Sequence, residues 1–178
     1  TDSTPTFNAH VTNTTMVMTA RSGIAFGGNV EHVMVVNTQT SSIYTSAIDT
    51  EPQGGAVRDV VLDNVYMDSW FDPGRAGSGN IPISIVGGST TAPSEVTQAQ
   101  KFRMTDCTVA QGGILISSAI DVVVDRCRVI CDFQSSNPQA VAPICVTGQC
   151  DAISITDNYI YDRVPGTPGG NHDGSIAV

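Results

Sequence analysis

A short pattern returns six times along the chain and constrains the fold more than any other feature. Each copy has two inward positions separated by one residue, then a pair of bend residues, then a further inward position two residues after the pair. This alternation predicts a strand, a sharp bend and a second strand. The six copies are Ala9, Val11, Asn13, Thr14 and Met16; Val33, Val35, Asn37, Thr38 and Thr40; Val60, Leu62, Asn64, Val65 and Met67; Phe102, Met104, Asp106, Cys107 and Val109; Val122, Val124, Arg126, Cys127 and Val129; and Ile153, Ile155, Asp157, Asn158 and Ile160.

The bend pair has its own composition. Its first residue is Asn or Asp in every copy except the fifth, which has Arg126. Asn and Asp tolerate the left-handed backbone region best among residues with a side chain, so the column is typical of a tight turn. The second residue is expected to point inward and to stack on its counterparts about 4.8 Å apart. That interior column contains Thr14, Thr38, Val65, Cys107, Cys127 and Asn158.

A second short strand follows each copy, as at Ile83 to Ile85 and Ile114 to Ile116, and the linkers are too short for helical crossovers. Strands stacked at a fixed offset predict an all-β solenoid, best described as a right-handed parallel β-helix of about six to seven coils with variable loops on one corner. An antiparallel sandwich is the main competitor. We expect residues 1–178 to form a single β-helix domain and to be a fragment of a longer chain, because the final residues 175–178 begin a coil that the sequence does not complete.

This pattern resembles the pectin-lyase-like β-helix proteins, a superfamily of polysaccharide lyases, hydrolases, epimerases and phage tailspikes. The resemblance extends from Phe7 onward and is clearest in residues 102–109, 122–129 and 153–160. It implies the β-helical fold, whereas the active residues of such families differ from one another. Its closest counterpart in kind is the β-helical domain of a tailspike or tail fibre, which implies a homotrimer.

The charge balance excludes some partners. The net charge is −9 and Lys101 is the only lysine, so the chain would repel phosphate backbones and anionic lipid surfaces. No apolar run approaches the roughly 18 residues of a membrane-spanning helix. The five cysteines form no CxxC pair, and we expect no metal site and no cofactor. Cys145 and Cys150 flank one turn, and the redox compartment would decide whether they form a disulfide.

Outward carboxylates are the candidates for catalysis. His32, Asp59, Lys101 and Asp121 occupy one outward column, and Asp125 lies in a second. Two coils separate Asp59 from Asp121 by about 9.6 Å at the backbone, at the upper end of the roughly 6.5 to 9.5 Å between the carboxyls of inverting glycosidases. Asp59, Asp121 and Asp125 are therefore acid/base candidates. The alternative is a surface ladder in which Lys101 neutralises its acidic neighbours and each exposed pair contributes about 0 to 1 kcal/mol.

Loop lengths predict a groove. Long connections at residues 68–80, 132–142 and 161–173 flank a minimal one at residues 110–112, and all are expected to leave the same corner. Aromatic faces beside polar side chains suit sugar recognition, although aromatic residues serve packing or subunit contacts as readily. The predicted glycan-binding residues are Trp70, Phe71, Arg75, Gln111, Phe133 and Tyr161.

These observations favour a structural β-helical segment of a virion appendage that binds host surface glycans, with a cell-surface polysaccharide as its partner. One alternative is a polysaccharide hydrolase or lyase of the same superfamily, for which Lys101, Arg103 and Arg128 are the candidate outward cations that hold a substrate carboxylate. A further alternative is a purely structural solenoid. The expected location is the virion, with a secreted or cell-surface location as the alternative.

Overall fold

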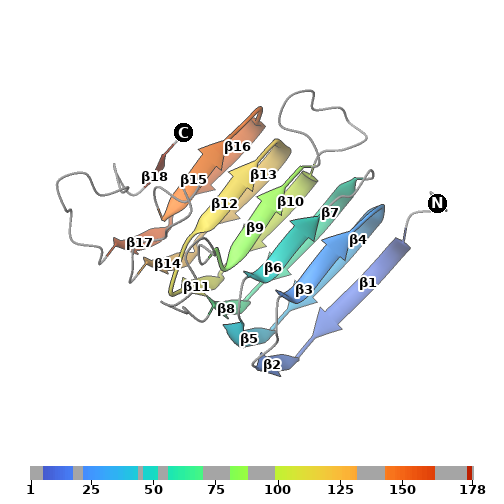
Figure 1. Ribbon diagram of the computed structural model, residues 1–178, viewed down its shortest axis with the longest axis horizontal. Helices are drawn as coiled ribbons and strands as arrows, with labels where there is room; N and C mark the ends of the chain where they lie inside the picture. The colour runs from blue at the N-terminus through green and yellow to red at the C-terminus, as the bar shows by residue number, and fades with distance from the viewer. Residues whose placement is uncertain are drawn as a thin grey trace, which may run out of the picture.

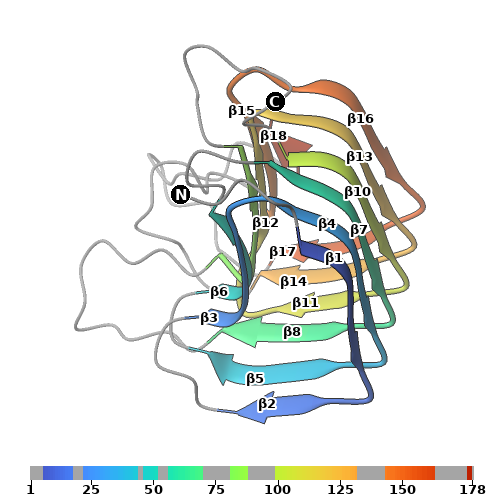
Figure 2. The ribbon, with the colours of Figure 1, turned by 90° about the vertical axis from the view of Figure 1, so that its right-hand side faces the viewer.

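Eighteen β-strands form three parallel sheets in the computed structural model, which describes residues 6–17, 22–43, 46–51, 56–69, 81–87, 99–131, 143–162 and 176–177 (Figure 1). Consecutive strands enter the three sheets in turn, so each set of three, here called a repeat, adds one strand to every sheet (Figure 2). Six such repeats lie within the described residues, and β18 belongs to the sixth rather than to a seventh. The all-β parallel arrangement is compatible with the expected β-helix.

Sheet A contains the longest strands. Its order is β1 (Thr6–Thr12), β4 (Val30–Val36), β7 (Val57–Asp63), β10 (Ala99–Thr105), β13 (Ala119–Asp125) and β16 (Asp151–Thr156). Sheet B follows the bend and contains β2 (Thr15–Val17), β5 (Gln39–Ile43), β8 (Tyr66–Ser69), β11 (Thr108–Ala110), β14 (Arg128–Cys131) and β17 (Tyr159–Asp162). Sheet C contains β3 (Ser22–Gly27), β6 (Ser46–Glu51), β9 (Ile83–Val86), β12 (Ile114–Ser117), β15 (Ile144–Thr147) and β18 (Ile176–Ala177).

The register predicted from the sequence is confirmed. In sheet A, Phe102 lies between Val60 and Val122, and Met104 lies between Leu62 and Val124. The inward residues form one continuous core, and the side chain of Phe102 has no exposed surface. Apolar burial of this kind stabilises a fold by about 25 cal/mol for each Å² removed from water.

The bend between sheets A and B has the predicted left-handed backbone in all six repeats, including the one with Arg126. The φ angles are 51° at Asn13, 50° at Asn37, 50° at Asn64, 52° at Asp106, 50° at Arg126 and 52° at Asp157. The exception therefore adopts the same geometry as its Asn and Asp counterparts. Tertiary pairing on both sides outweighs the weaker intrinsic preference of Arg for this region.

The interior column after the bend uses side chains to bond backbone carbonyls. The hydroxyl of Thr38 donates to the carbonyl of Val36 at 3.1 Å, and the thiols of Cys107 and Cys127 contact the carbonyls of Thr105 and Asp125 at 3.1 and 3.2 Å. Contact with Cys127 and then burial raise the pKa of the Cys107 thiol above its ordinary value. The two cysteines thus replace threonine in a structural role. None of the five cysteines, including Cys145 and Cys150, is joined in a disulfide in the structure.

The strands of sheet A contain a second left-handed column that the sequence did not reveal. Its members have φ between 52° and 60° and are Asn8, His32, Asp59, Lys101, Asp121 and Ala152. The cross-strand register passes over these positions, for example from Phe7 with Glu31 to Ala9 with Val33. Each residue is therefore a local irregularity in its strand, and it occurs at the equivalent position in every repeat.

The sequence predicted that the long connections all leave one corner, but the structure has long connections at two corners. The connection between β9 and β10, residues 87–98, passes from sheet C to sheet A, whereas the three predicted long connections pass from sheet B to sheet C. The spacing of the motifs along the sequence shows that one repeat is longer than its neighbours. It does not show at which corner the extra residues lie. In the described part of the chain, no helix is long and apolar enough to cross a membrane.

Candidate functional site

The outer side of sheet B, called here the sheet B face, collects polar and aromatic side chains in two columns. The first column follows directly from the bend, and its members pair in register across the six strands. It contains Thr15, Gln39, Tyr66, Thr108, Arg128 and Tyr159. The second column lies nearer the predicted groove and contains Asp68, Ala110, Ile130 and Tyr161. Side chains alternate along a strand, so both columns face away from the core.

Two stacked tyrosines and an arginine form the end of the sheet B face that lies on β14 and β17. The rings of Tyr159 and Tyr161 have centroids 6.4 Å apart and planes inclined by 16°. The guanidinium carbon of Arg128 lies 5.6 Å from the centroid of Tyr159, a cation–π distance. Tyr159 is 58% exposed and Tyr161 is 42% exposed. Both tyrosines thus present part of their surface to solvent.

Asp68 occupies an unusual position in the second column. Gln111 donates from Nε2 to its Oδ2 at 3.4 Å, whereas the buried Oδ1 has no hydrogen-bond partner among the residues that the structure describes. Burial raises the pKa of Asp68 above its ordinary value. Burial, and then the charge of Asp68, raise the pKa of Tyr66. The pair of Asp68 and Gln111 therefore marks the short connection that the sequence identified as a groove floor.

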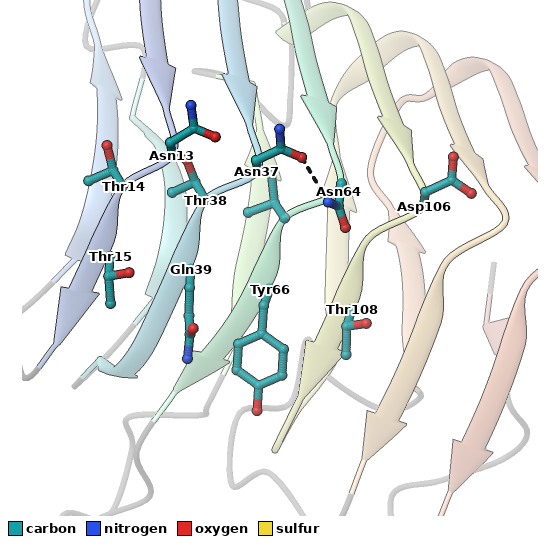
Figure 3. A pocket seen from close by; sticks show the side chains of 11 residues that line it. Asn13, Thr14, Thr15, Asn37, Thr38, Gln39, Asn64, Tyr66, Asp106 and Thr108 are labelled. Carbon is teal, nitrogen blue, oxygen red and sulfur yellow. Dashed lines mark hydrogen bonds between the residues drawn. The ribbon is translucent and has the colours of Figure 1, made fainter.

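A shallow groove runs along the bend between sheets A and B (Figure 3). It has a volume of about 420 Å³, and four repeats supply its sides. Asn64 donates from Nδ2 to Oδ1 of Asn37 at 2.8 Å along this column. The lining consists of Asn13, Thr14, Thr15, Asn37, Thr38, Gln39, Asn64, Val65, Tyr66, Asp106 and Thr108.

Arg126 lies at the same bend position in the next repeat and pairs with Asp106. Its Nε and Nη2 donate to the two carboxylate oxygens of Asp106 at 3.0 and 2.9 Å. This contact lowers the pKa of Asp106 and raises that of Arg126. The ion pair lies at the end of the groove, because Asp106 lines it and Arg126 does not.

Asp59, a predicted acid/base residue, is paired with a histidine on the outer side of sheet A. Nδ1 of His32 lies 2.5 Å from Oδ2 of Asp59, within hydrogen-bond distance. Both side chains are about half exposed. They border a depression of about 350 Å³ that is also lined by Asn8, His10, Val33, Met34 and Val61.

The other two predicted carboxylates are held by cations. Arg103 donates from Nη2 to both oxygens of Asp121, at 2.8 and 2.9 Å, and from Nη1 to its backbone carbonyl. Asp125 accepts from Nη1 of Arg126 and from the hydroxyl of Thr156. The surface ladder anticipated as the alternative is thus present, but Arg103 rather than Lys101 neutralises Asp121.

Of the six predicted glycan-binding residues, the structure describes Gln111 and Tyr161 and brings both to the sheet B face. Trp70, Phe71, Arg75 and Phe133 lie outside the described residues. The sequence analysis did not single out Asp68 or Tyr159, and it considered Arg128 only as a cation for a lyase. The repeat alignment contained the necessary signal, because Tyr66, Arg128 and Tyr159 all stand two residues after the first bend residue.

The chain matches no family model, no curated protein and no solved structure in the comparisons with known proteins. Within the described residues, no group of three or more His, Cys, Asp or Glu side chains is placed to hold a metal ion.

Proposed function

We propose that the chain is a structural segment of a right-handed parallel β-helix in an extended appendage, as in virion tailspikes and fibres, and that it binds surface glycans through the sheet B face. The sequential entry of strands into three parallel sheets supports the helical path. The acidic balance and single lysine fit an external structure that avoids nucleic acid and anionic membranes. A structural role alone requires no more than the continuous core.

The single observation that carries glycan binding is the exposed pair of Tyr159 and Tyr161 beside Arg128. Aromatic faces pack against the apolar faces of sugar rings, and the phenol hydroxyls and guanidinium supply directional hydrogen bonds. Asp68 lies in the second column of the same face, three strands from Tyr161, and Gln111 contacts it, so the pair adds an amide and a carboxylate along the face. An apolar contact with polar groups beside it is typical of a carbohydrate site.

A glycan array probed with the purified chain tests this proposal, followed by calorimetry on any ligand found. Tyr159→Ala should weaken binding by about tenfold or more, equivalent to about 1.4 kcal/mol. The matched control is Val123→Ala, which shortens a side chain on the outer side of sheet A outside the His32 and Asp59 depression and should leave the affinity unchanged. A silent array with a folded chain would support the purely structural alternative.

Assembly into a homotrimer is part of the proposal and depends on the resemblance to tailspikes. Size-exclusion chromatography with light scattering measures it directly. A mass of three chains supports the assembly, and a stable monomer counts against it.

Polysaccharide cleavage is the second candidate function, and the pair of His32 and Asp59 favours it. A carboxylate that bonds a histidine orients its ring, which is the arrangement used in general acid–base catalysis. Asp121 and Asp125 are weaker candidates because Arg103 and Arg126 neutralise them. Turnover of a glycan that survives in both Asp59→Asn and Asp121→Asn would remove these assignments.

A further inference from the structure

We propose that the groove at the bend between sheets A and B binds a linear, uncharged polysaccharide that lies across the repeats, with one sugar unit for each repeat. This proposal rests on the proposed glycan binding. It adds the class of the glycan, its course across the repeats and the groove in which it binds. The groove lining ends at Asp106 and Thr108, and the next two strands carry Arg128 and Tyr159 of the tyrosine end.

Each of four successive repeats supplies the groove with the same two positions. The first is the bend residue and the second stands two residues later, at the start of the sheet B strand (Figure 3). The pairs are Asn13 with Thr15, Asn37 with Gln39, Asn64 with Tyr66, and Asp106 with Thr108. Neighbouring pairs are about 4.8 Å apart, so the outer pairs are separated by about 14 Å. One sugar unit in an extended polysaccharide has a length comparable to this spacing. Each sugar unit would therefore contact the same two positions in its own repeat.

The side chains that line the groove offer both donors and acceptors. Each Asn has an amide with two N–H groups and a carbonyl oxygen with two lone pairs, and the hydrogen bond from Asn64 to Asn37 uses one of each. The carbonyl oxygen of Gln39 remains able to accept, because its Nε2 is the group that donates to Ser41. Sugar hydroxyls both donate and accept. The exposed ring of Tyr66 adds an apolar face in the third pair.

The charges favour a neutral ligand. The described lining contains no Lys or Arg, and Asp106 stays ionised because the Arg126 contact lowers its pKa. The guanidinium of Arg126 is directed to Asp106 and Asp125, so it does not offset a further acidic group in the groove. An acidic polysaccharide would bring negative charge to Asp106 without a compensating cation. The net charge of −9 also disfavours the binding of an acidic polysaccharide.

An extended peptide fits the groove less well. Peptides that bind sheets gain affinity from unpaired backbone groups at an edge strand. Strands β5 and β8 are paired on both sides, so the middle of the groove offers side chains and no backbone edge. Side chains in a regular polar ladder suit a polyhydroxylated polymer.

Calorimetry with neutral oligosaccharides of increasing length, from disaccharide upward, tests the proposal on the whole chain. Affinity should rise with each added unit and level off at about four units, because four repeats line the groove. Asn37→Gly and Asn64→Gly should each weaken binding of the longer ligands by about tenfold. Gly keeps the left-handed φ of these bends while removing the amide, so the fold should be retained.

The matched control is Asp157→Gly, which makes the same kind of change at the same bend position outside the groove lining and should leave the affinity unchanged. Binding that depends on Tyr159 but not on ligand length, Asn37 or Asn64 would overturn the groove site and leave the proposed glycan binding intact. A preference for acidic over neutral glycans would overturn the ligand class. Failure of every glycan to bind would overturn both proposals.

Discussion

Arg126 binds both carboxylate oxygens of Asp106 through Nε and Nη2, at 3.0 and 2.9 Å, although its own backbone is left-handed with φ of 50°. The pair joins the bends of two adjacent repeats and lowers the pKa of Asp106. Both side chains are about half exposed, so the ion pair changes the pKa of Asp106 more than it stabilises the fold.

Substitution Arg126→Asn should return the pKa of Asp106 toward its ordinary value of 3.8. Asn suits the left-handed bend, so the variant should remain folded. Carbon-detected NMR titration of the Asp106 carboxyl measures the shift. The control is Arg58→Gln, which removes a different arginine. An unchanged Asp106 titration in Arg126→Asn would show that the pair does not form in solution.

The bend at Asn64 should discriminate between glycine and alanine. Its φ of 50° is costly for a residue with a Cβ and no local hydrogen bond, and Asn64→Ala should lower the free energy of unfolding by about 1 kcal/mol. Asn64→Gly should lose less, because Gly adopts positive φ without a steric cost. Both variants lose the amide contact with Asn37, so urea denaturation of the two isolates the backbone effect. Equal stabilities would contradict a left-handed bend.

The partly buried carboxyl of Asp68 should make stability depend on pH. Burial raises its pKa above 3.8 in the folded state, so the folded chain keeps this proton at pH values where the unfolded chain has lost it. Stability therefore falls as pH rises from 3.8 through the folded pKa. Asp68→Asn does not titrate and should gain stability relative to the parent over that window. Thermal melts across the window test this, with Asp157→Asn at an exposed bend as the control; parallel profiles for the parent and Asp68→Asn would refute it.

Gly87 marks a close approach between repeats at the end of β9. A Cβ at this position would lie 2.2 Å from the carbonyl oxygen of Ser118. Gly87→Ala should therefore lower stability by about 1 to 3 kcal/mol, the usual cost of overpacking. Gly28→Asn is the comparison, because Gly28 has φ of +71° with open space around it and Asn tolerates that backbone. Chemical denaturation should show a clear loss for Gly87→Ala only.

The sequence predicted the register because two independent signals agreed. Apolar alternation placed Val60, Phe102 and Val122 side by side, and the Asn or Asp at the bend fixed the phase of each repeat. The left-handed column of sheet A was missed although Asn8, Asp59 and Asp121 are of types that favour positive φ, because Lys101 and Ala152 interrupt that signal.

Side-chain partners were harder to predict than strand positions. Arg103 reaches Asp121 across one strand interval, and a choice between Arg103 and Lys101 depends on rotamers rather than on periodicity. The raised pKa of Asp68 likewise arises from burial at the end of a strand, which alternation does not encode. The hydrophobic pattern therefore predicts the strands and their register, whereas the candidate site depends on side-chain contacts that the pattern does not predict.

The central claim is that glycan binds along the outer side of sheet B. The most direct test is NMR mapping of backbone amide shifts while an array-selected glycan is titrated into the folded chain. The account predicts shifts at Tyr66, Tyr159 and Tyr161, with little change at His32 and Asp59 on sheet A. Shifts centred on His32 and Asp59, or no shifts at saturating glycan, would contradict it.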